Sequence, residues 1–344
     1  MKKETKALLR DLQGRIAKQY EADPADVTAG KQFSITGPQG EKLLGAVQAQ
    51  SPFLQKINMP LVTDIQGEKV FAGIQQTITG RRKQGRYRQT LDPDGAEYYC
   101  VETDSGIIIP WQRLDTWARM GNKMAQLYAA YVQQQIALDQ CMIAWRGISV
   151  ADNTDTTANP LLEDVNKGFM QWMRENKAEN IMEEGATAGE ISIFGANADF
   201  ANLDDLAYDL KQGLGDAHRE RTDLIFMVGA DLVAKEASIV SKDKGLVPTE
   251  RGALKQYDLM STFGGLPAVI LPNFPARGAV ITTYNNLSIY TQDASMRRAV
   301  KDDDDLKGVI DSYLRREAYV VEDESLFVGI EFDNVVLPGD TPAP

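Results

Sequence analysis

The sequence has one histidine, His218, and two cysteines, Cys100 and Cys141, among its 344 residues. A single histidine excludes paired-histidine metal motifs and leaves at most one imidazole for acid–base catalysis. Two cysteines cannot build a disulfide framework or a cysteine-ligated zinc site, and they fit a reducing compartment better than an oxidising one. The residue types on which most metalloproteins and many enzymes depend are therefore scarce.

Long apolar runs are also absent. Charged residues recur from Lys2 to Lys18, so the N-terminus lacks the apolar region of a signal peptide. The longest uncharged stretch of interest, residues 259–276, contains three prolines and two adjacent glycines and cannot form a membrane-spanning helix. We therefore expect a soluble protein with no membrane partner.

An excess of positive charge is missing as well. The chain has 37 Lys+Arg against 49 Asp+Glu, which gives a formal net charge of -12 at pH 7. A protein that coats DNA by counterion release needs a basic surface, so that class is excluded. An apolar content of 43% is enough for a core, and the length predicts two domains or one large domain with insertions.

The first half of the chain predicts a helix, an arm, a hairpin and a second helix. Apolar spacing indicates an amphipathic helix over residues 5–21, and the glycine-punctuated segment 30–45 is interpreted as extended. Strand-like runs over 70–78 and 98–109 flank residues 80–95 and predict a long hairpin. A stripe from Leu114 to Trp145 predicts one continuous helix over 113–146, with Trp117 in the core.

The second half predicts mixed helices and strands. Helices are expected over residues 162–176, 203–213 and 231–241, and strands over 224–228, 267–271, 279–284 and 287–290. Residues 313–336 predict two strands around 323–325, and residues 338–344 a loose tail. Taken together, the elements indicate an α+β fold.

The most informative charge feature is a cluster of five basic residues at the tip of the predicted hairpin: Arg81, Arg82, Lys83, Arg86 and Arg88. A solvated loop, a nucleic-acid contact and a docking arm for an acidic surface are the alternatives. Only Tyr87 offers a ring for stacking on bases, and the remainder of the chain is too acidic to support nucleic acid. Residues 293–344 have a net charge of -7, so a positive tip and a negative C-terminal region suggest association between copies.

Other candidate sites carry little chemistry. His218 lies near Asp216 and Asp223 but has no nucleophile motif, so a surface-loop histidine is the plainer interpretation. The run 302–305 of four aspartates lacks the spacing of a calcium loop, and residues 80–86 lack the lysine of a phosphate loop. We predict no catalytic, cofactor-binding or metal-ligating residue, and a soluble α+β enzyme with a carboxylate-based site is kept as the alternative.

Short segments in order along the chain carry a resemblance to a known family. They are Glu4-Thr5-Lys6, residues 51–58, 67–69 and 114–119, Asn159-Pro160, residues 266–268 and 286–290, Ser295 with Arg297-Arg298, and residues 319–323. With the order of elements, they make the chain similar to the major capsid proteins of tailed double-stranded DNA phages, which have the HK97-like fold. The detail most resembles the Peduovirus-type, or P2-like, capsid proteins.

The resemblance implies a division of the chain. Residues 1–33 would be a basic helical segment that a phage protease removes near Phe33 and Ser34, and residues 34–66 an N-terminal arm. Residues 67–110 would be the E-loop hairpin, whose basic tip contacts a neighbouring subunit. Residues 111–205 would be the P domain with its spine helix, 206–285 the A domain, 286–338 the closing strands of the P domain, and 339–344 a loose tail.

The resemblance also implies a function. Such a protein is not an enzyme and self-assembles into the pentamers and hexamers of an icosahedral head that encloses double-stranded DNA without sequence-specific binding. Its partners would be a scaffolding protein, a maturation protease and a portal protein, and its location the virion capsid after assembly in the bacterial cytoplasm. Residues 1–33 have a net charge of +2, so the processed chain would have -14, which suits a wall that must not hold DNA phosphates.

Overall fold

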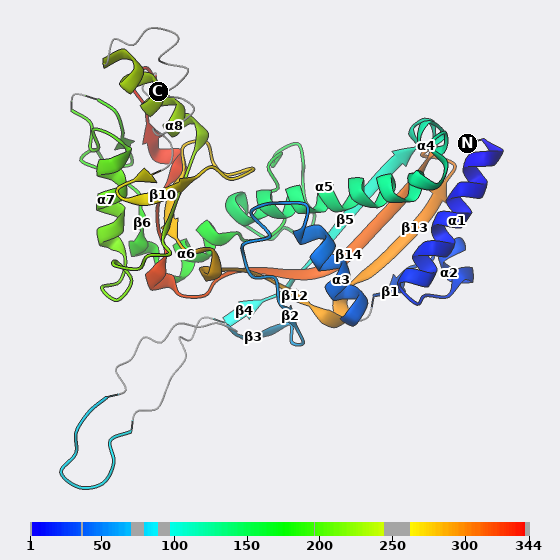
Figure 1. Cartoon of the computed structure of the whole chain (residues 1–344), viewed down its shortest axis with the longest axis horizontal. Coiled ribbons are helices and arrows are strands. Elements are labelled where there is room, and N and C mark those ends of the chain that lie inside the picture. The colour runs from blue at the N-terminus through cyan, green and yellow to red at the C-terminus, as the bar shows by residue number, and fades with distance from the viewer. Residues whose placement is uncertain are drawn as a thin grey trace.

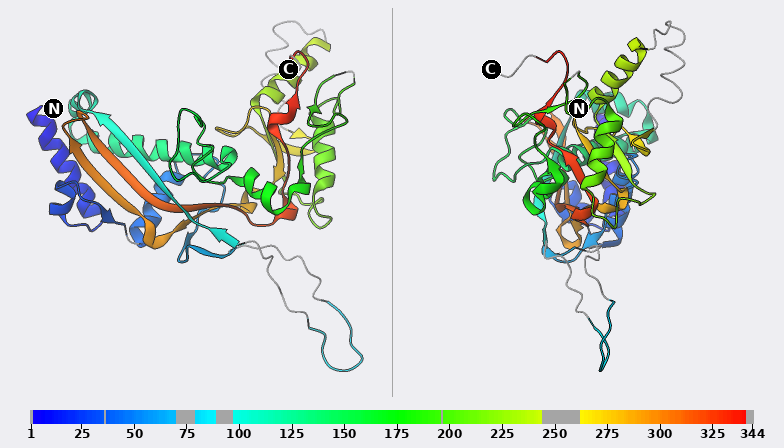
Figure 2. Two further views of the ribbon diagram at one scale, coloured as in Figure 1. Left: turned by 180° about the vertical axis from the view of Figure 1, so that it is seen from behind. Right: turned by 90° about the vertical axis from the view of Figure 1, so that its left-hand side faces the viewer.

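The computed structural model describes residues 2–35, 37–69, 79–88, 97–195, 197–243 and 262–340. They form two six-stranded sheets, one along an elongated body and one in an upright unit far from the N-terminus (Figure 1). Residues 79–88 lie apart from both units in every view (Figures 1 and 2). The predicted α+β class is confirmed.

One strand of fourteen residues, β14 (Gly308–Val321), organises the long sheet. It pairs with β5 (Val101–Pro110) over most of its length, with β13 (Arg297–Asp303) over its first half and with β12 (Leu287–Gln292) at its far end. The short strands β1 (Phe33–Ser34) and β2 (Leu61–Val62) pair with β13 and β12. Burial alternates along β14 up to Glu317 and is continuous beyond it, where α6 (Phe169–Asn176) packs on the strand.

The predicted continuous helix over 113–146 is wrong, because the chain breaks at Gly121. It forms α4 (Trp111–Ala118), a short turn η1 (Gly121–Lys123) and α5 (Met124–Arg146). Gly121 has φ +58°, a left-handed conformation that glycine adopts without steric cost. The rings of Trp117 and Tyr131 are 5.9 Å apart, whereas fourteen residues of straight helix would separate them by about 20 Å. The first segment therefore folds back toward the second.

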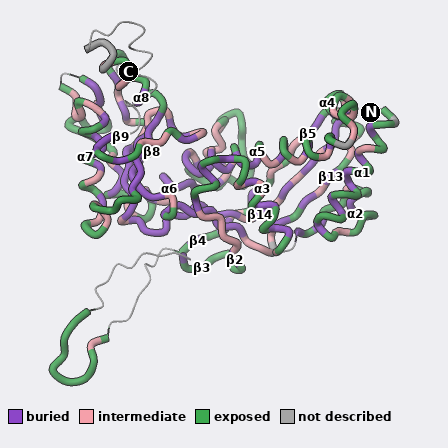
Figure 3. Tube along the Cα trace, viewed as in Figure 1, coloured by how far each residue is buried: buried purple, intermediate pink, exposed green. Residues whose placement is uncertain are grey.

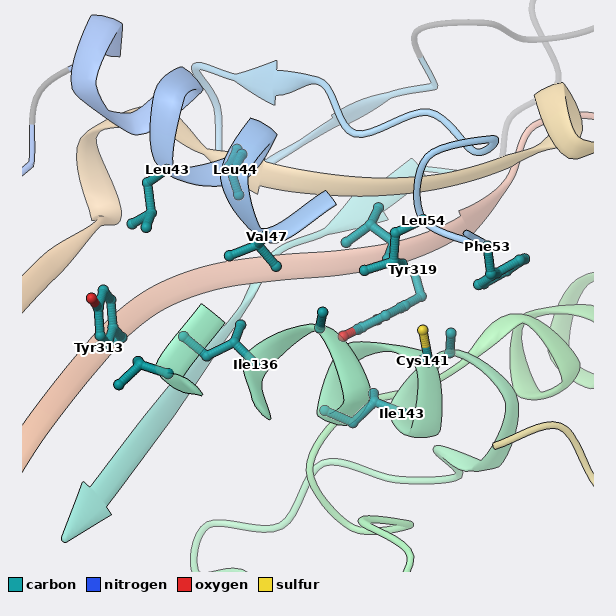
Figure 4. Close-up of a cluster of buried hydrophobic side chains, with 14 of the residues drawn as sticks. Leu43, Leu44, Val47, Phe53, Leu54, Ile136, Cys141, Ile143, Tyr313 and Tyr319 are labelled. Carbon is teal, nitrogen blue, oxygen red and sulfur yellow. The ribbon is translucent and has the colours of Figure 1, made fainter. Parts of the chain in front are cut away.

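The buried face of α5 also departs from the predicted stripe. From Met124 onward the buried positions include Tyr128, Val132 and Ile136, while Tyr131 is more than one-third exposed. Figure 4 shows Ile136 of α5 across from Leu43 and Val47, and Cys141 of α5 across from Leu54. Met124 and Tyr128, directly after the break, are still buried, so the departure begins at Tyr131, where burial follows the helical period of about 3.6 residues instead of the shorter average spacing of the predicted stripe.

The N-terminal region is more helical than predicted. The helix α1 (Lys3–Gln19) confirms the first prediction, and Asp23 caps α2 (Pro24–Thr28) by accepting a 2.8 Å hydrogen bond from the Ala25 amide. The interpretation of residues 30–45 as extended is wrong, since α3 (Gly37–Gln48) forms there. Its Leu43, Leu44 and Val47 are buried in the core, and Gly40 lets Met296 approach so closely that a Cβ would be 2.2 Å from its Cε.

The second sheet largely follows the predicted elements. Its order is β6 (Ile181–Met182), β15 (Val328–Ile330), β11 (Ala279–Thr282), β8 (Ile225–Val228), β10 (Leu266–Val269) and β9 (Thr262–Phe263). The helices α7 (Leu203–Gly213) and α8 (Ala230–Asp243) are close to the predicted ranges, whereas α6 starts seven residues later than predicted. A small ribbon joins β7 (Ile191–Ser192) to β16 (Val335–Val336), and the Arg277 side chain holds Asp340 at 2.7 Å.

Buried amide groups fix the corner between the two sheets. The chain passes from β14 to β15 through η5 (Glu324–Leu326) and from β11 to β12 through η3 (Tyr284–Asn286). The Asn286 side chain accepts a hydrogen bond from the Asp323 amide at 2.8 Å and donates one to the Asp323 carbonyl at 2.9 Å. Asn180, in η2 (Ala178–Asn180), donates to the carbonyls of Glu324 and Phe327. The corner is therefore satisfied by hydrogen bonds rather than held by apolar packing alone.

Candidate functional site

The five basic residues of the predicted tip are all exposed and lie far from the two sheets (Figure 3). Within the part of the chain that the structure describes, none of them forms an ion pair with a carboxylate. The glycines of the supposed phosphate loop belong to this exposed segment, which has no helix between residues 79 and 88. The expected strand over 70–78 and residues 89–96 of the predicted hairpin lie outside the described residues.

We use 'arm' for the predicted E-loop that carries the basic tip. A two-stranded ribbon forms the root of this arm, where it joins the elongated body. The strands β3 (Gln66–Glu68) and β4 (Glu97–Tyr99) pair antiparallel. The next residue, Lys69, turns its ammonium group inward, 2.8 Å from both carboxylate oxygens of Glu324. Trp172 donates to the same carboxylate at 3.0 Å. This buried contact anchors the root to the corner between the two sheets.

The outer surface of the root is acidic. Glu68 and Glu97 are directly opposite in the ribbon and both are exposed. Asp64 is exposed just before β3, and Glu102 forms an exposed 3.2 Å pair with Arg316 on β14. Like charges at directly opposed positions destabilise a ribbon unless a cation lies between them.

A groove of about 660 Å³ lies beside this acidic surface. Its walls come from the ribbon, β5, β14, α6 and the loop that follows α5. Tyr99, Ile65 and Val150 line it with their side chains partly in solvent, and Tyr99 is 61% exposed. Glu175 lines it too and is paired with Lys167 at 2.8 Å. Apolar and aromatic residues with a rim of charge are typical of a surface that contacts another protein.

His218 differs from the expected surface-loop histidine. It is half-buried at the corner, with its Nε2 3.1 Å from the Asp323 carboxylate, whereas Asp216 and Asp223 pair with arginines of their own loop. The Ser325 hydroxyl donates to that same carboxylate. The carboxylate thus lies between serine and histidine, so the imidazole is not placed to take a proton from the hydroxyl.

The aspartate run, residues 302–305, lies at the turn between β13 and β14. Asp302 accepts a 2.8 Å hydrogen bond from the Trp111 indole, and Asp303 accepts from the amides of Asp305 and Leu306 between β13 and β14. Among the residues described, no group of three histidine, cysteine or acidic side chains could hold a metal ion. Nor is any helix in the described ranges both long and apolar enough to cross a membrane.

The two predicted processing residues form strand β1. Phe33 is buried and packs on Tyr20 of the N-terminal segment, with ring centres 6.0 Å apart, and both residues pair with β13. Lys31 and Gln32, immediately before the strand, are exposed. Ser34 is exposed as well, so of the four residues 31–34 only Phe33 is buried.

Several residues of the acidic root surface were not predicted from the sequence. Glu68 and Glu97 are 29 positions apart, and their opposition depends on the register of the ribbon. The expected acidic partner region, residues 293–344, contributes less surface charge than its composition suggests. Five of its carboxylates are buried inside the molecule: Asp311, Glu317, Glu322, Asp323 and Glu324.

Comparison with known proteins identifies this architecture. The solved procapsid of satellite phage P4, which includes a size determination protein, contains a chain similar to 87% of this one. The match covers 91% of that chain, with a TM-score of 0.76 and 27% sequence identity. The fold is therefore the HK97-like fold of phage capsid proteins, as the resemblance implied.

The family follows from the sequence comparisons. The model of the phage major capsid protein, P2 family, matches residues 8–332. The capsid protein of Escherichia phage P2 is 32% identical over 94% of this chain and 92% of its own length. The major capsid protein of Serratia phage KSP20 is 28% identical over 93% of each chain. The chain belongs to the P2 family of phage major capsid proteins.

Family membership confirms the predicted function. The protein is a structural component of a phage capsid and assembles with copies of itself into a shell. The proteins of this family are shell components, so the enzyme alternative has no support.

Proposed function

We propose that this major capsid protein forms the pentamers and hexamers of an icosahedral head that encloses double-stranded DNA, through the projecting E-loop arm. The observation that carries the proposal is the separation of residues 79–88 from both sheets, with five cations exposed (Figures 1 and 3). Charge held so far from its own body gains little from intramolecular pairing and is available to a neighbouring subunit.

The two sheets support the domain assignment that we propose. The long sheet with α5 would be the P domain, the second sheet the A domain, residues 34–66 the N-terminal arm and residues 67–110 the E-loop. Strands β6 and β15 lie in residues 111–205 and 286–338, which the resemblance gives to the P domain, but they pair within the second sheet, so the proposed A domain would also include strands from both flanking segments.

The remaining partners are proposed from the family resemblance. A scaffolding protein would direct shell assembly in the bacterial cytoplasm, a portal protein would occupy one vertex, and a maturation protease would remove the N-terminal segment. Cleavage at Phe33 or Ser34 would require local opening of β1, whereas Lys31 and Gln32 are exposed without it. The acidic balance of the chain suits an inner wall from which packaged DNA must later be released.

Charge reversal at the arm tip tests the contact. We expect Arg81→Glu, Arg82→Glu and Arg86→Glu together to lower the yield of shells by about tenfold, because like charges would then meet at the interface. Electron microscopy of the full chain, expressed with and without scaffolding protein, measures the yield. The matched control reverses three exposed cations elsewhere: Lys42→Glu, Arg119→Glu and Lys123→Glu. Shells formed equally well by the tip variant would refute the role of the tip.

A further inference from the structure

We propose that the basic tip of one subunit binds the acidic root of the arm of the next subunit. The inference rests on the proposed role of the arm in contacts between subunits and names the surface that receives it. That surface comprises the exposed carboxylates of Asp64, Glu68, Glu97 and Glu102 together with the adjoining groove.

The root has a charge arrangement that calls for a cation from outside. Glu68 and Glu97 are opposed in the ribbon, and no lysine or arginine in the described ranges pairs with either. The adjacent Lys69 cannot serve, because its ammonium is buried against Glu324. Gln66 donates a hydrogen bond to Glu97 but brings no charge. The repulsion therefore persists in the isolated subunit and is relieved by a basic partner.

The groove beside the carboxylates gives the contact an apolar part. Tyr99 is 61% exposed at its edge, next to Ile65 and Val150. The tip offers arginines, which with tyrosine are among the side chains that contribute most to protein interfaces. The pairs Glu102–Arg316 and Glu175–Lys167 at the rim are largely exposed, so they stabilise little and can exchange partners.

The tip cannot fill the root of its own subunit in this conformation. Residues 79–88 lie well away from the ribbon in each view (Figures 1 and 2). Tip and root are therefore different surfaces of the same molecule, and a contact between them joins copies head to tail. A head-to-tail contact closes into a ring when its rotation permits and continues as an open chain otherwise. Capsomers require that the contact closes into a ring.

A charge-swap experiment tests the pairing. The root variant Glu68→Lys with Glu97→Lys is compared with the tip variant of Arg81, Arg82 and Arg86 to glutamate, and with a chain that carries both sets. We expect each set alone to lower the yield of capsomers and shells by about tenfold and the combination to recover to within about threefold of the unaltered chain. Sedimentation and electron microscopy measure both. Asp209→Lys with Glu220→Lys, exposed carboxylates on the α7 side, is the control.

A neutral root variant separates assembly from folding. In Glu68→Gln with Glu97→Gln the repulsion disappears, so we expect the subunit to melt at the same or a higher temperature while assembly falls. This variant also decides the question if the lysine variant does not fold. Unchanged assembly of a folded root variant would overturn the pairing, as would a combined variant with no recovery, and both leave the proposed function intact. If the unaltered chain never forms capsomers, the proposed function itself fails.

Discussion

At the scale of the residue, burial separates two tryptophans that the sequence pattern treats alike. Trp117 and Trp145 both lie on the predicted stripe, yet Trp117 is half-buried against Tyr131 while Trp145 is 1% exposed. Trp145 is surrounded by Phe53, Phe169 and Phe274, with ring centres 5.7, 5.4 and 4.8 Å away. The prediction that Trp117 is a core residue is therefore wrong, and Trp145 is the tryptophan that lies in the core.

Truncation of the two tryptophans checks this difference. Trp145→Ala should destabilise the subunit by about 3–5 kcal/mol, since it leaves a large cavity among aromatic rings. Trp117→Ala should lower the free energy of unfolding by about 1–2 kcal/mol, because part of that ring is already in water. Urea unfolding of the unassembled subunits gives both values. Equal losses would contradict the assigned burial.

At the scale of the element, a single glycine decides whether the molecule has one helix or two. Gly121 is left-handed and no atom lies within 4 Å of the position that a Cβ would take, so its conformation rather than crowding requires glycine. The turn lets α4 lie near α1, where the Thr5 hydroxyl and the Lys2 amide donate to Asp115. Asp115 thus joins α4 to the N-terminal segment, which also contacts the long sheet directly through the pairing of β1 with β13.

Substitution of two open glycines distinguishes conformation from space. Gly121→Ala should cost about 1 kcal/mol, because alanine resists the left-handed region. Gly14→Ala in α1, which also has nothing within 4 Å, should instead stabilise the subunit by about 0.5–1 kcal/mol. Thermal or urea unfolding of both variants measures the difference. A stabilising effect of alanine at position 121 would mean that the helix is continuous in solution.

At the scale of the whole molecule, the seam between α5 and β14 is polar as well as apolar. Arg298 and Asp311 form a buried pair 2.7 Å apart, and the Tyr128 hydroxyl donates to the same carboxylate at 2.9 Å. The pKa values of Tyr128, Tyr313 and Tyr319 are raised well above the ordinary value of 10.0. Burial is the main cause, and the nearby carboxylates are the second. A buried network of this kind is fully satisfied only in one alignment of helix and strand.

These phenols predict a loss of stability at alkaline pH. A folded pKa above the unfolded value means that the stabilisation is present below about pH 10 and is lost as the pH rises above it, because the unfolded chain releases the protons first. Each phenol adds up to about 1.4 kcal/mol of loss per pH unit in that range. Urea unfolding between about pH 8 and pH 11 measures the slope. Tyr128→Phe should reduce it, and a flat profile would contradict the burial of the phenols.

Much of the local structure could be predicted from the sequence. Helix α7 and strands β8, β11 and β12 form where periodicity and turn residues placed them, because each has its own buried stripe or apolar run. Helix α3 was mispredicted because its stability comes from packing on α5. The start of α6 was mispredicted because residues 162–168 form a loop before the helix. Of the candidate site, the five tip cations are visible in the sequence, and the acidic root is not.

The scarcity of histidine and cysteine, the acidic balance and the basic cluster were determined by the sequence alone, because composition and local spacing need no fold to be counted. Those features already excluded most catalytic and metal chemistry and indicated a docking arm. Only the tertiary structure decided which carboxylates are buried and which stay exposed. It buries Glu317 and Glu324 with their cationic partners and leaves Glu68 opposite Glu97 on the surface. Which carboxylates stay exposed depends on register and on contacts between distant segments, which residue order along the chain does not specify.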